Sequence, residues 1–152
     1  MAIRLIRKEP DEVLRKTSRE VTVFDERLAQ LLDDMYDTMY DAGGVGLAAV
    51  QVGILKRAVV VDTREEGERY ELVNPKLVYK KGEREVAEGC LSVPGVSGYV
   101  KRPEKVIVRA QNRNGETFEV EAKGLLAQAF CHEIEHLDGG LFIDKVTEYI
   151  DD

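Results

Sequence analysis

Two histidines and two glutamates near the C-terminal end of the chain have the spacing of a metal site. The sequence Phe130-Cys-His-Glu-Ile-Glu-His-Leu-Asp-Gly-Gly140 contains the pattern His-Glu-x-x-His. Residues four apart share one face of a helix, so His132 and His136 can point at the same ion. They are the only histidines in the chain. Because a catalytic metal usually has three protein ligands and one open position, a third ligand must come from elsewhere.

A helical wheel separates the two glutamates of this pattern. At ~100° per residue, His132 lies at 0° and His136 at ~40°, on the edge of an apolar arc from ~20° to ~220°. Glu133 at ~100° falls inside this arc, and Glu135 at ~300° falls outside it. A poorly solvated carboxylate holds its proton more readily, as an alternating general base and acid requires. We expect Glu133 to be catalytic and Glu135 to be a solvated surface acid. A core acid paired with lysine or arginine is the alternative for Glu133.

The third ligand is expected upstream of the histidines. Cys131 adjoins His132 but points to ~260° on the wheel, so we interpret it as a small free thiol. No histidine follows His136, and too little chain remains for a second ligand-bearing helix. Cys90 is the best upstream candidate, because a thiolate suits zinc or ferrous iron and Gly89 before it allows close backbone approach. Taken alone, a cysteine after a strand is more often a small core residue.

The elements that must position these residues can be read from periodicity and turn signals. A helix is expected over residues 123–137, and another follows Asp25, with an apolar stripe, and stops at Asp41-Ala-Gly-Gly. A short helix is expected at Pro10. Strands are expected at 2–6, 57–62, 71–75, 76–79, 85–88, 105–110 and 117–122, the last two joined by a turn at Asn114-Gly115. We expect Pro94 to end the strand before it. The pattern predicts an α+β fold with largely antiparallel sheets around the His-Glu-x-x-His helix.

Composition limits the class of protein. A length of 152 residues with 43% hydrophobic residues suits a single globular domain over residues 1–152. The net charge of −7 argues against non-specific nucleic-acid binding, and the most basic segment, 76–84, is interpreted as a solvated strand and turn. We expect no membrane association and a cytoplasmic location, since no stretch approaches ~18 apolar residues and no leader is visible. In such a compartment, Cys90 and Cys131 favour thiol chemistry or metal binding over a disulfide.

Three motifs in the chain, taken together, resemble one enzyme family. They are Gly44-Val-Gly-Leu-Ala-Ala-Val-Gln51, Glu88-Gly-Cys-Leu-Ser92 and His132-Glu-Ile-Glu-His136, in that order. The chain thereby resembles peptide deformylases, which remove the N-terminal formyl group from newly made bacterial polypeptides. Their motifs are G-x-G-φ-A-A-x-Q, with φ apolar, E-G-C-[LI]-S and H-E-x-[DE]-H. The resemblance covers about residues 2–144, and three motifs with compatible spacing are highly specific.

The resemblance implies a set of catalytic roles. Cys90, His132 and His136 would hold one divalent metal, usually ferrous iron, although zinc, nickel or cobalt can occupy such sites. Metal-bound hydroxide would attack the formyl carbon of a formyl-methionyl peptide, with Glu133 as general base and then acid. Formate and a free amino terminus would be released. The formyl oxygen would be stabilised by Gln51 and by the backbone N–H of Leu91.

The resemblance also implies a substrate site. Val45 and Gly46 would pair with the peptide through their backbone, Gly89 would adjoin it, and the methionine pocket would include Val45, Leu125 and Ala129. The wheel agrees for the last two, which lie at ~20° and ~60° above the histidines. The chain departs from the family at Cys131, where glutamine is common. Longer members carry an additional C-terminal helix, whereas here an acidic stretch, 148–152, follows. The resemblance implies a transient ribosome contact, but not one made through such a helix.

Three other functions share part of this pattern. A metalloprotease would use the same histidine motif but would leave the Gly44–Gln51 stretch and the upstream cysteine unexplained. A nucleotide-binding module would match Gly44-x-Gly46-x-x-Ala49, although here a helix precedes the glycines and a strand follows. A structural zinc site would have no open coordination position, so binding of a hydroxamate to the metal would distinguish it from a catalytic one.

Overall fold

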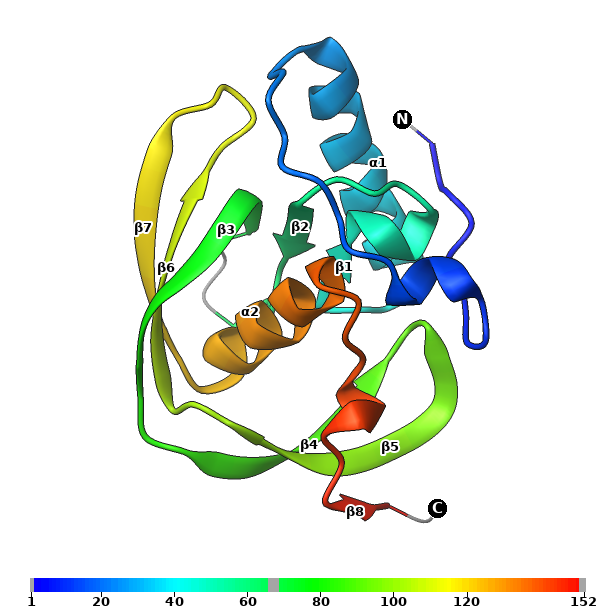
Figure 1. Cartoon of the computed structure of the whole chain (residues 1–152), viewed down its shortest axis with the longest axis vertical. Helices are drawn as coiled ribbons and strands as arrows, with labels where there is room; N and C mark the ends of the chain where they lie inside the picture. The colour runs from blue at the N-terminus through cyan, green and yellow to red at the C-terminus, as the bar shows by residue number, and fades with distance from the viewer. Residues whose placement is uncertain (1, 66–68, 151–152) are drawn as a thin grey trace.

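Two antiparallel sheets enclose a central helix in the computed structural model, which describes residues 2–65 and 69–150 (Figure 1). The larger sheet has the strand order β1-β2-β3-β6-β7 and the smaller one the order β4-β5-β8. The α+β class with largely antiparallel sheets is therefore confirmed. The strands are β1 (Gly46–Ala48), β2 (Ala58–Val61), β3 (Tyr70–Lys81), β4 (Arg84–Cys90), β5 (Val93–Arg102), β6 (Lys105–Gln111), β7 (Thr117–Lys123) and β8 (Glu148–Tyr149). The helices are α1 (Glu26–Asp41), α2 (Gly124–Leu137) and the short 3-10 turns η1 (Glu12–Arg15), η2 (Ala49–Val52) and η3 (Phe142–Asp144).

Helix α1 begins and ends where the sequence predicts. The Asp25 side chain accepts a hydrogen bond from the Leu28 N–H at 3.1 Å, which caps the helix. Its apolar stripe is buried against β1, β2 and η2. After Asp41 the chain turns through Gly43, whose φ of +72° is readily adopted only by glycine. This turn leads directly into the segment before β1.

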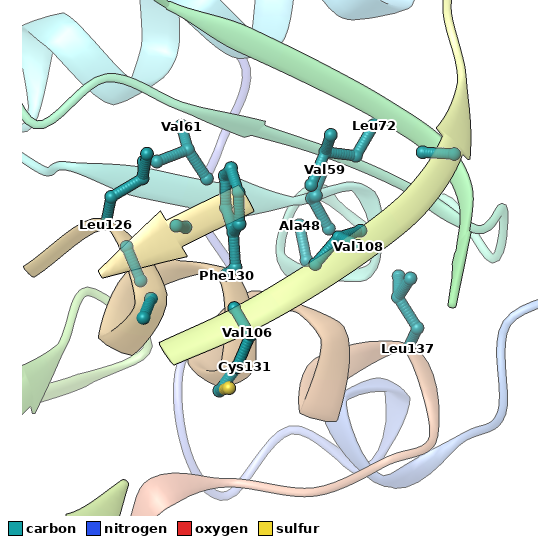
Figure 2. Close-up of a cluster of buried hydrophobic side chains, with 14 of the residues drawn as sticks. Ala48, Val59, Val61, Leu72, Val106, Val108, Leu126, Phe130, Cys131 and Leu137 are labelled. Carbon is teal, nitrogen blue, oxygen red and sulfur yellow. The ribbon is translucent and has the colours of Figure 1, made fainter. Parts of the chain in front are cut away.

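Helix α2 is anchored to the larger sheet by a buried apolar cluster (Figure 2). Phe130 is fully buried and packs edge-on against Tyr70, with 5.4 Å between ring centroids. The other labelled side chains come mainly from β2, β3, β6 and α2 itself. Packing of this density fixes the rotation of α2 about its axis. The histidines on its neighbouring face are thereby held in place.

The opposite side of α2 corrects one expectation. Gln128 and Cys131, expected outside the buried arc, are both buried. Cys131 belongs to the apolar cluster against the larger sheet, whereas the Gln128 Nε2 group donates a hydrogen bond to the Ala87 carbonyl of β4, in the smaller sheet, at 3.0 Å. The expectation of a solvated Glu135 is also wrong, because its side chain is only 22% exposed and pairs with Arg102 and Lys145. A helix between two sheets has no fully solvated face.

The strand expected at residues 2–6 is absent. Residues 2–8, here called the N-terminal arm, instead lie extended beside α1 (Figure 1). The Ala2 N–H donates to Asp34 Oδ1 and the Arg4 N–H to Thr38 Oγ1, both at 2.9 Å. Side chains of a helix thus replace the neighbouring strand that the alternating pattern predicted.

Two further differences concern the strands. The runs at 71–75 and 76–79 form one strand, β3, with a bulge between Val73 and Lys76. At the bulge, Asn74 has φ of +52° and its side chain bonds both backbone groups of Val21. Strand β5 was not predicted, and Pro94 lies inside it rather than ending a strand. The last two acids, at positions 151 and 152, lie outside the described residues, and no described helix is long and apolar enough to cross a membrane.

Candidate active site

The predicted third ligand lies beside the two histidines. Cys90 ends β4, while His132 and His136 project from one face of α2. The Cys90 Sγ atom is 3.4 Å from His136 Nε2, which is 3.3 Å from His132 Nε2. All three ligand atoms lie within 4.8 Å of one another. The fold therefore brings residues from two distant parts of the sequence to one point.

The chemistry of these three groups fits a divalent metal. Nδ1 of His132 contacts the Glu88 carboxylate, which leaves Nε2 as the ligand atom facing Cys90 and His136. Burial holds the pKa of His136 well below its ordinary value, so its imidazole is neutral and can donate a lone pair. A thiol with two imidazoles is the kind of donor set that zinc and ferrous iron accept. The residues present therefore fit the ion that the motif predicts.

Behind His132 lies a buried ionic network. The Glu88 carboxylate accepts hydrogen bonds from Arg102 Nε and Nη2 at 2.9 and 2.8 Å, and Arg102 is only 2% exposed. Burial alone would raise the pKa of Glu88, but the hydrogen bonds from His132 and Arg102 lower it instead. Nη1 of the same arginine donates to Glu135 at 2.7 Å. This chain of contacts fixes the orientation of the His132 ring.

Glu133 is buried without a counter-charge of its own. It is 4% exposed, its Oε1 atom has no hydrogen-bond partner among the described residues, and Oε2 lies 3.9 Å from His132 Nε2. Burial raises its pKa to about 7. A methyl group at Gly46 would come within 2.6 Å of Oε2, so glycine at this position makes room for the carboxylate. The environment is that of a group able to gain and lose a proton near neutral pH.

Gln51 presents an oriented amide to the same region. Its Oε1 atom accepts a hydrogen bond from the Ala48 N–H at 2.9 Å, which fixes the amide. Nε2 consequently faces Ser92 Oγ at 3.0 Å and Cys90 Sγ at 3.7 Å. Gln51 is almost fully buried, so this N–H donor has little competition from water.

A cavity of about 880 Å³ opens beside these groups. Of the residues predicted for the site, only His136 does not line it, and that side chain is fully buried. The predicted substrate residues on its wall are Val45, Gly46, Gly89, Leu125 and Ala129, with the Leu91 backbone and side chain nearby. A cavity of this size exceeds a single methionine side chain and can hold several residues of a peptide.

Three residues of the site were not predicted to have a role there: Glu88, Arg102 and Ser92. A signal for Glu88 was present, because residues two apart on a strand share a face and Cys90 follows at that spacing. Ser92 likewise follows Cys90 in the same motif. Arg102 gave no signal, since it ends a strand, β5, that was not predicted.

Comparison with known proteins agrees with the motifs. The family model described as polypeptide deformylase matches residues 3–150. A peptide deformylase of Acetivibrio thermocellus is 59% identical over 152 residues, which is 100% of this chain and 88% of that protein. The crystal structure of a peptide deformylase from Legionella pneumophila has a TM-score of 0.93 at 50% identity, over 96% of this chain and 87% of that chain.

A more distant structure gives the same answer. The peptide deformylase from Thermotoga maritima has a TM-score of 0.93 at 38% identity, over 97% of this chain and 99% of that one. The matches extend along nearly the whole length of both partners, so they are not confined to the metal-binding motif. This chain belongs to the polypeptide deformylase family of enzymes.

Proposed function

We propose that this enzyme hydrolyses the formyl group from the N-terminus of formyl-methionyl peptides and releases formate, within a single catalytic domain. The observation that carries the proposal is the meeting of Cys90, His132 and His136, with ligand atoms within 4.8 Å, beside the uncompensated carboxylate of Glu133. Substrates would be the formylated ends of newly made proteins. A cytoplasmic location and a transient ribosome contact are consistent with such substrates.

Cys90, His132 and His136 would hold one divalent ion, for which we propose ferrous iron, with zinc, nickel and cobalt as substitutes. Such an ion lowers the pKa of a bound water molecule and polarises a carbonyl group. Three protein ligands beside an open cavity support a catalytic rather than a structural site. The Glu88–Arg102 pair would keep His132 in the tautomer that binds through Nε2.

Glu133 would move the protons of the reaction. With its pKa near 7, it accepts a proton from the attacking water as the new C–O bond forms at the formyl carbon. Negative charge then develops on the formyl oxygen, where Gln51 Nε2 and the Leu91 N–H would donate hydrogen bonds. Glu133 returns the proton to the nitrogen as the C–N bond breaks, which gives formate and a free amino terminus.

The walls of the cavity would position the peptide. Val45 and Gly46 would pair with its backbone, next to Gly89 on the facing strand. The methionine side chain would lie against Val45 and against Leu125 and Ala129, which precede His132 on α2 by about two turns and one turn. The nucleotide-binding alternative lacks support, because Gly46 lies in an antiparallel sheet rather than a parallel βαβ unit.

Anaerobic purification with metal analysis, followed by assay of formate release from formyl-Met-Ala, tests the proposal. One equivalent of metal and formate release, with no cleavage of an unformylated internal peptide bond, is the expected result. Cleavage of internal bonds without formate release would favour a metalloprotease. Inhibition by a hydroxamate that displaces water from the metal would further exclude a closed structural site.

A further inference from the structure

The N-terminal arm forms a wall of the active-site cavity for which the proposed mechanism has no use. The arm residues that line that cavity are the aliphatic Ile3, Leu5 and Ile6 and the basic Arg4 and Lys8. Ile3 is 61% exposed and Leu5 is 80% exposed, which leaves two large aliphatic side chains open to water side by side. Exposed apolar groups at the rim of a binding cavity are typical of contact surfaces for a ligand.

The arm is fixed at both ends rather than free. At its start, the backbone N–H groups of Ala2 and Arg4 bond to α1, and the Arg4 guanidinium pairs with Asp34 at 2.9 Å. At its other end, the Arg7 N–H donates to the Gln51 carbonyl at 2.6 Å. Successive side chains of an extended segment point to opposite sides, so Ile3 and Leu5 point away from the helix that Arg4 faces. Their position beside the cavity is therefore defined by the fold.

The arm lies where a bound peptide would leave the metal centre. From Gly46 the chain runs back to Gly44 and then to the end of α1, where Ala42 and Thr38 line the same cavity. Thr38 is the residue that holds the Arg4 backbone. A peptide that follows Val45 and Gly46 away from the metal ligands consequently runs toward the arm.

Two apolar side chains, Leu91 and Val45, lie along this path. Leu91 packs over Gly44, with its Cδ1 atom 2.7 Å from the position of a Cβ at that glycine. Val45 is 36% exposed at the cavity wall. Leu91 and Val45 thus extend the surface that Ile3 and Leu5 begin.

We propose that Ile3 and Leu5 form an apolar subsite for the substrate residues that follow formyl-methionine and its neighbour. The inference rests on the proposed deformylase activity and adds a preference to it. Peptides with aliphatic third and fourth residues would cover the two exposed side chains and gain binding energy. Peptides with small polar third and fourth residues would leave the two side chains exposed and would not gain this binding energy.

The experiment compares kcat/KM of the metal-loaded full chain for formyl-Met-Ala-Leu-Leu and formyl-Met-Ala-Ser-Ser, with formyl-Met-Ala as the short reference. The Leu-Leu peptide should be preferred, and the double variant Ile3→Ser/Leu5→Ser should reduce that preference about three- to tenfold. Val23→Ser is the matched control, because Val23 is 63% exposed but does not line the cavity. Thermal unfolding of each variant confirms that the fold is retained.

Loss of the preference in the double variant, with its retention in the control, supports the subsite. If the double variant kept the wild-type ratio of kcat/KM for the two tetrapeptides, even with a lower kcat/KM on both, the subsite would be refuted. If the wild-type enzyme released formate from formyl-Met-Ala but showed no preference among tetrapeptides, the subsite alone would be wrong. If it released no formate from any of the peptides, the proposed function would fail as well.

Discussion

The two glutamates of α2 stand two residues apart and have opposite environments. Glu135 faces the smaller sheet, where Arg102 and Lys145 pair with it. Glu133 faces the cavity, and one of its oxygens has no partner among the described residues. Burial raises the pKa of Glu133 to about 7, whereas Glu135 has two cations within reach. The carboxylate on one side of the helix is paired with cations, and the carboxylate on the other side is not.

This difference separates the side of α2 that holds the site in place, where Glu135 lies, from the side proposed to carry out the reaction, where Glu133 lies. Buried polar atoms without partners are rare in folded proteins and are concentrated at functional sites, because each one reduces stability. Among the described residues, α2 has two such atoms, Glu133 Oε1 at the cavity and Nδ1 of the fully buried His136 ring beside His132. The network on the other side ends at Glu88, which contacts His132. The satisfied side therefore holds in place the residues of the unsatisfied side.

The largest expected effect separates the two cysteines. Cys90→Ala should abolish stoichiometric metal binding, because it removes one of the three proposed ligands. Cys131→Ala should retain the metal, since that thiol is buried in the apolar cluster. Metal content of purified protein, measured by mass spectrometry, is the test. The reverse pattern of metal content would refute the ligand assignment.

Next in size is the comparison of the glutamates. Glu133→Gln should keep the metal and lower kcat by about 10²- to 10⁴-fold, because the amide cannot accept or return a proton. Glu135→Gln should retain most of the activity, since that carboxylate does not line the cavity. Formate release under saturating substrate measures both. A Glu133→Gln variant with near wild-type kcat would disprove the assigned role.

The ionic network of Glu88, Arg102 and Glu135 can be disrupted by replacing Arg102. Arg102→Leu should lower the free energy of unfolding by about 3–5 kcal/mol, because Glu88 would stay buried without its main counter-charge. Arg109→Leu removes an exposed pair with Glu119 and should change stability by less than about 1 kcal/mol. Urea denaturation of the two variants gives the comparison. Equal effects would mean that burial of the Arg102 network is energetically unimportant.

On the cavity side, the Gln51 amide can be removed. Gln51→Ala should retain the metal and lower kcat, because loss of one donor to a developing oxyanion raises the activation free energy by about 2.7–4 kcal/mol. Because Gln51 is proposed to act in the transition state, KM should change less than kcat. Steady-state kinetics with formyl-Met-Ala measures both, and an unchanged kcat would remove Gln51 from the oxyanion site.

The smallest effect concerns a buried acid that, unlike Glu133, is fully paired. Burial alone would raise the pKa of Asp34, but hydrogen bonds from Ala2, Gln30 and Arg4 lower it below 3.8. A lowered pKa stabilises the fold above the ordinary value of the group, and this contribution is lost as pH falls through the folded-state value.

Asp34→Asn should therefore reduce the free energy of unfolding by about 1 kcal/mol at neutral pH. The difference from wild type should begin to shrink below about pH 4, where Asp34 gains a proton in the unfolded state, and should disappear as pH falls through the lower folded-state pKa. Denaturation of metal-free protein across this range is the measurement. A difference that is constant with pH would show that the Asp34 charge does not contribute.

Local signals predicted the parts of the fold that local physics determines. The Asp25 cap, the Asn114-Gly115 turn and the histidine face of α2 depend on residues close in sequence. Cys90 was found as a ligand candidate because a count of histidines left one position to fill. The structure places its sulfur among the ligand atoms of His132 and His136.

The remaining features depend on partners distant in sequence. Strand β5 contains Pro94 and two glycines, which are uncommon inside strands, and it is held mainly by pairing with β4. The alternation at residues 2–6 is typical of a strand, but α1 supplies the hydrogen-bond partners. Glu135 pairs with Arg102 and Lys145 only in the folded chain. These distant partners could not be inferred from the helical wheel, so the side chain was expected to be solvated. A single helical wheel contains no information about a second sheet.

The position of β1 in the sheet has a consequence for which proteins can be processed. Among the described residues, this three-residue strand has only one strand partner, β2, so no strand covers its other edge. The Ala48 N–H is already bonded to the Gln51 side chain, which leaves Val45 and Gly46 for the proposed pairing with a peptide. Main-chain pairing is indifferent to side-chain identity, and so short an edge admits only a few extended residues. Under the proposed function, the enzyme would accept the beginnings of very different proteins while these are still unfolded. Completed domains with buried ends would be excluded by shape alone.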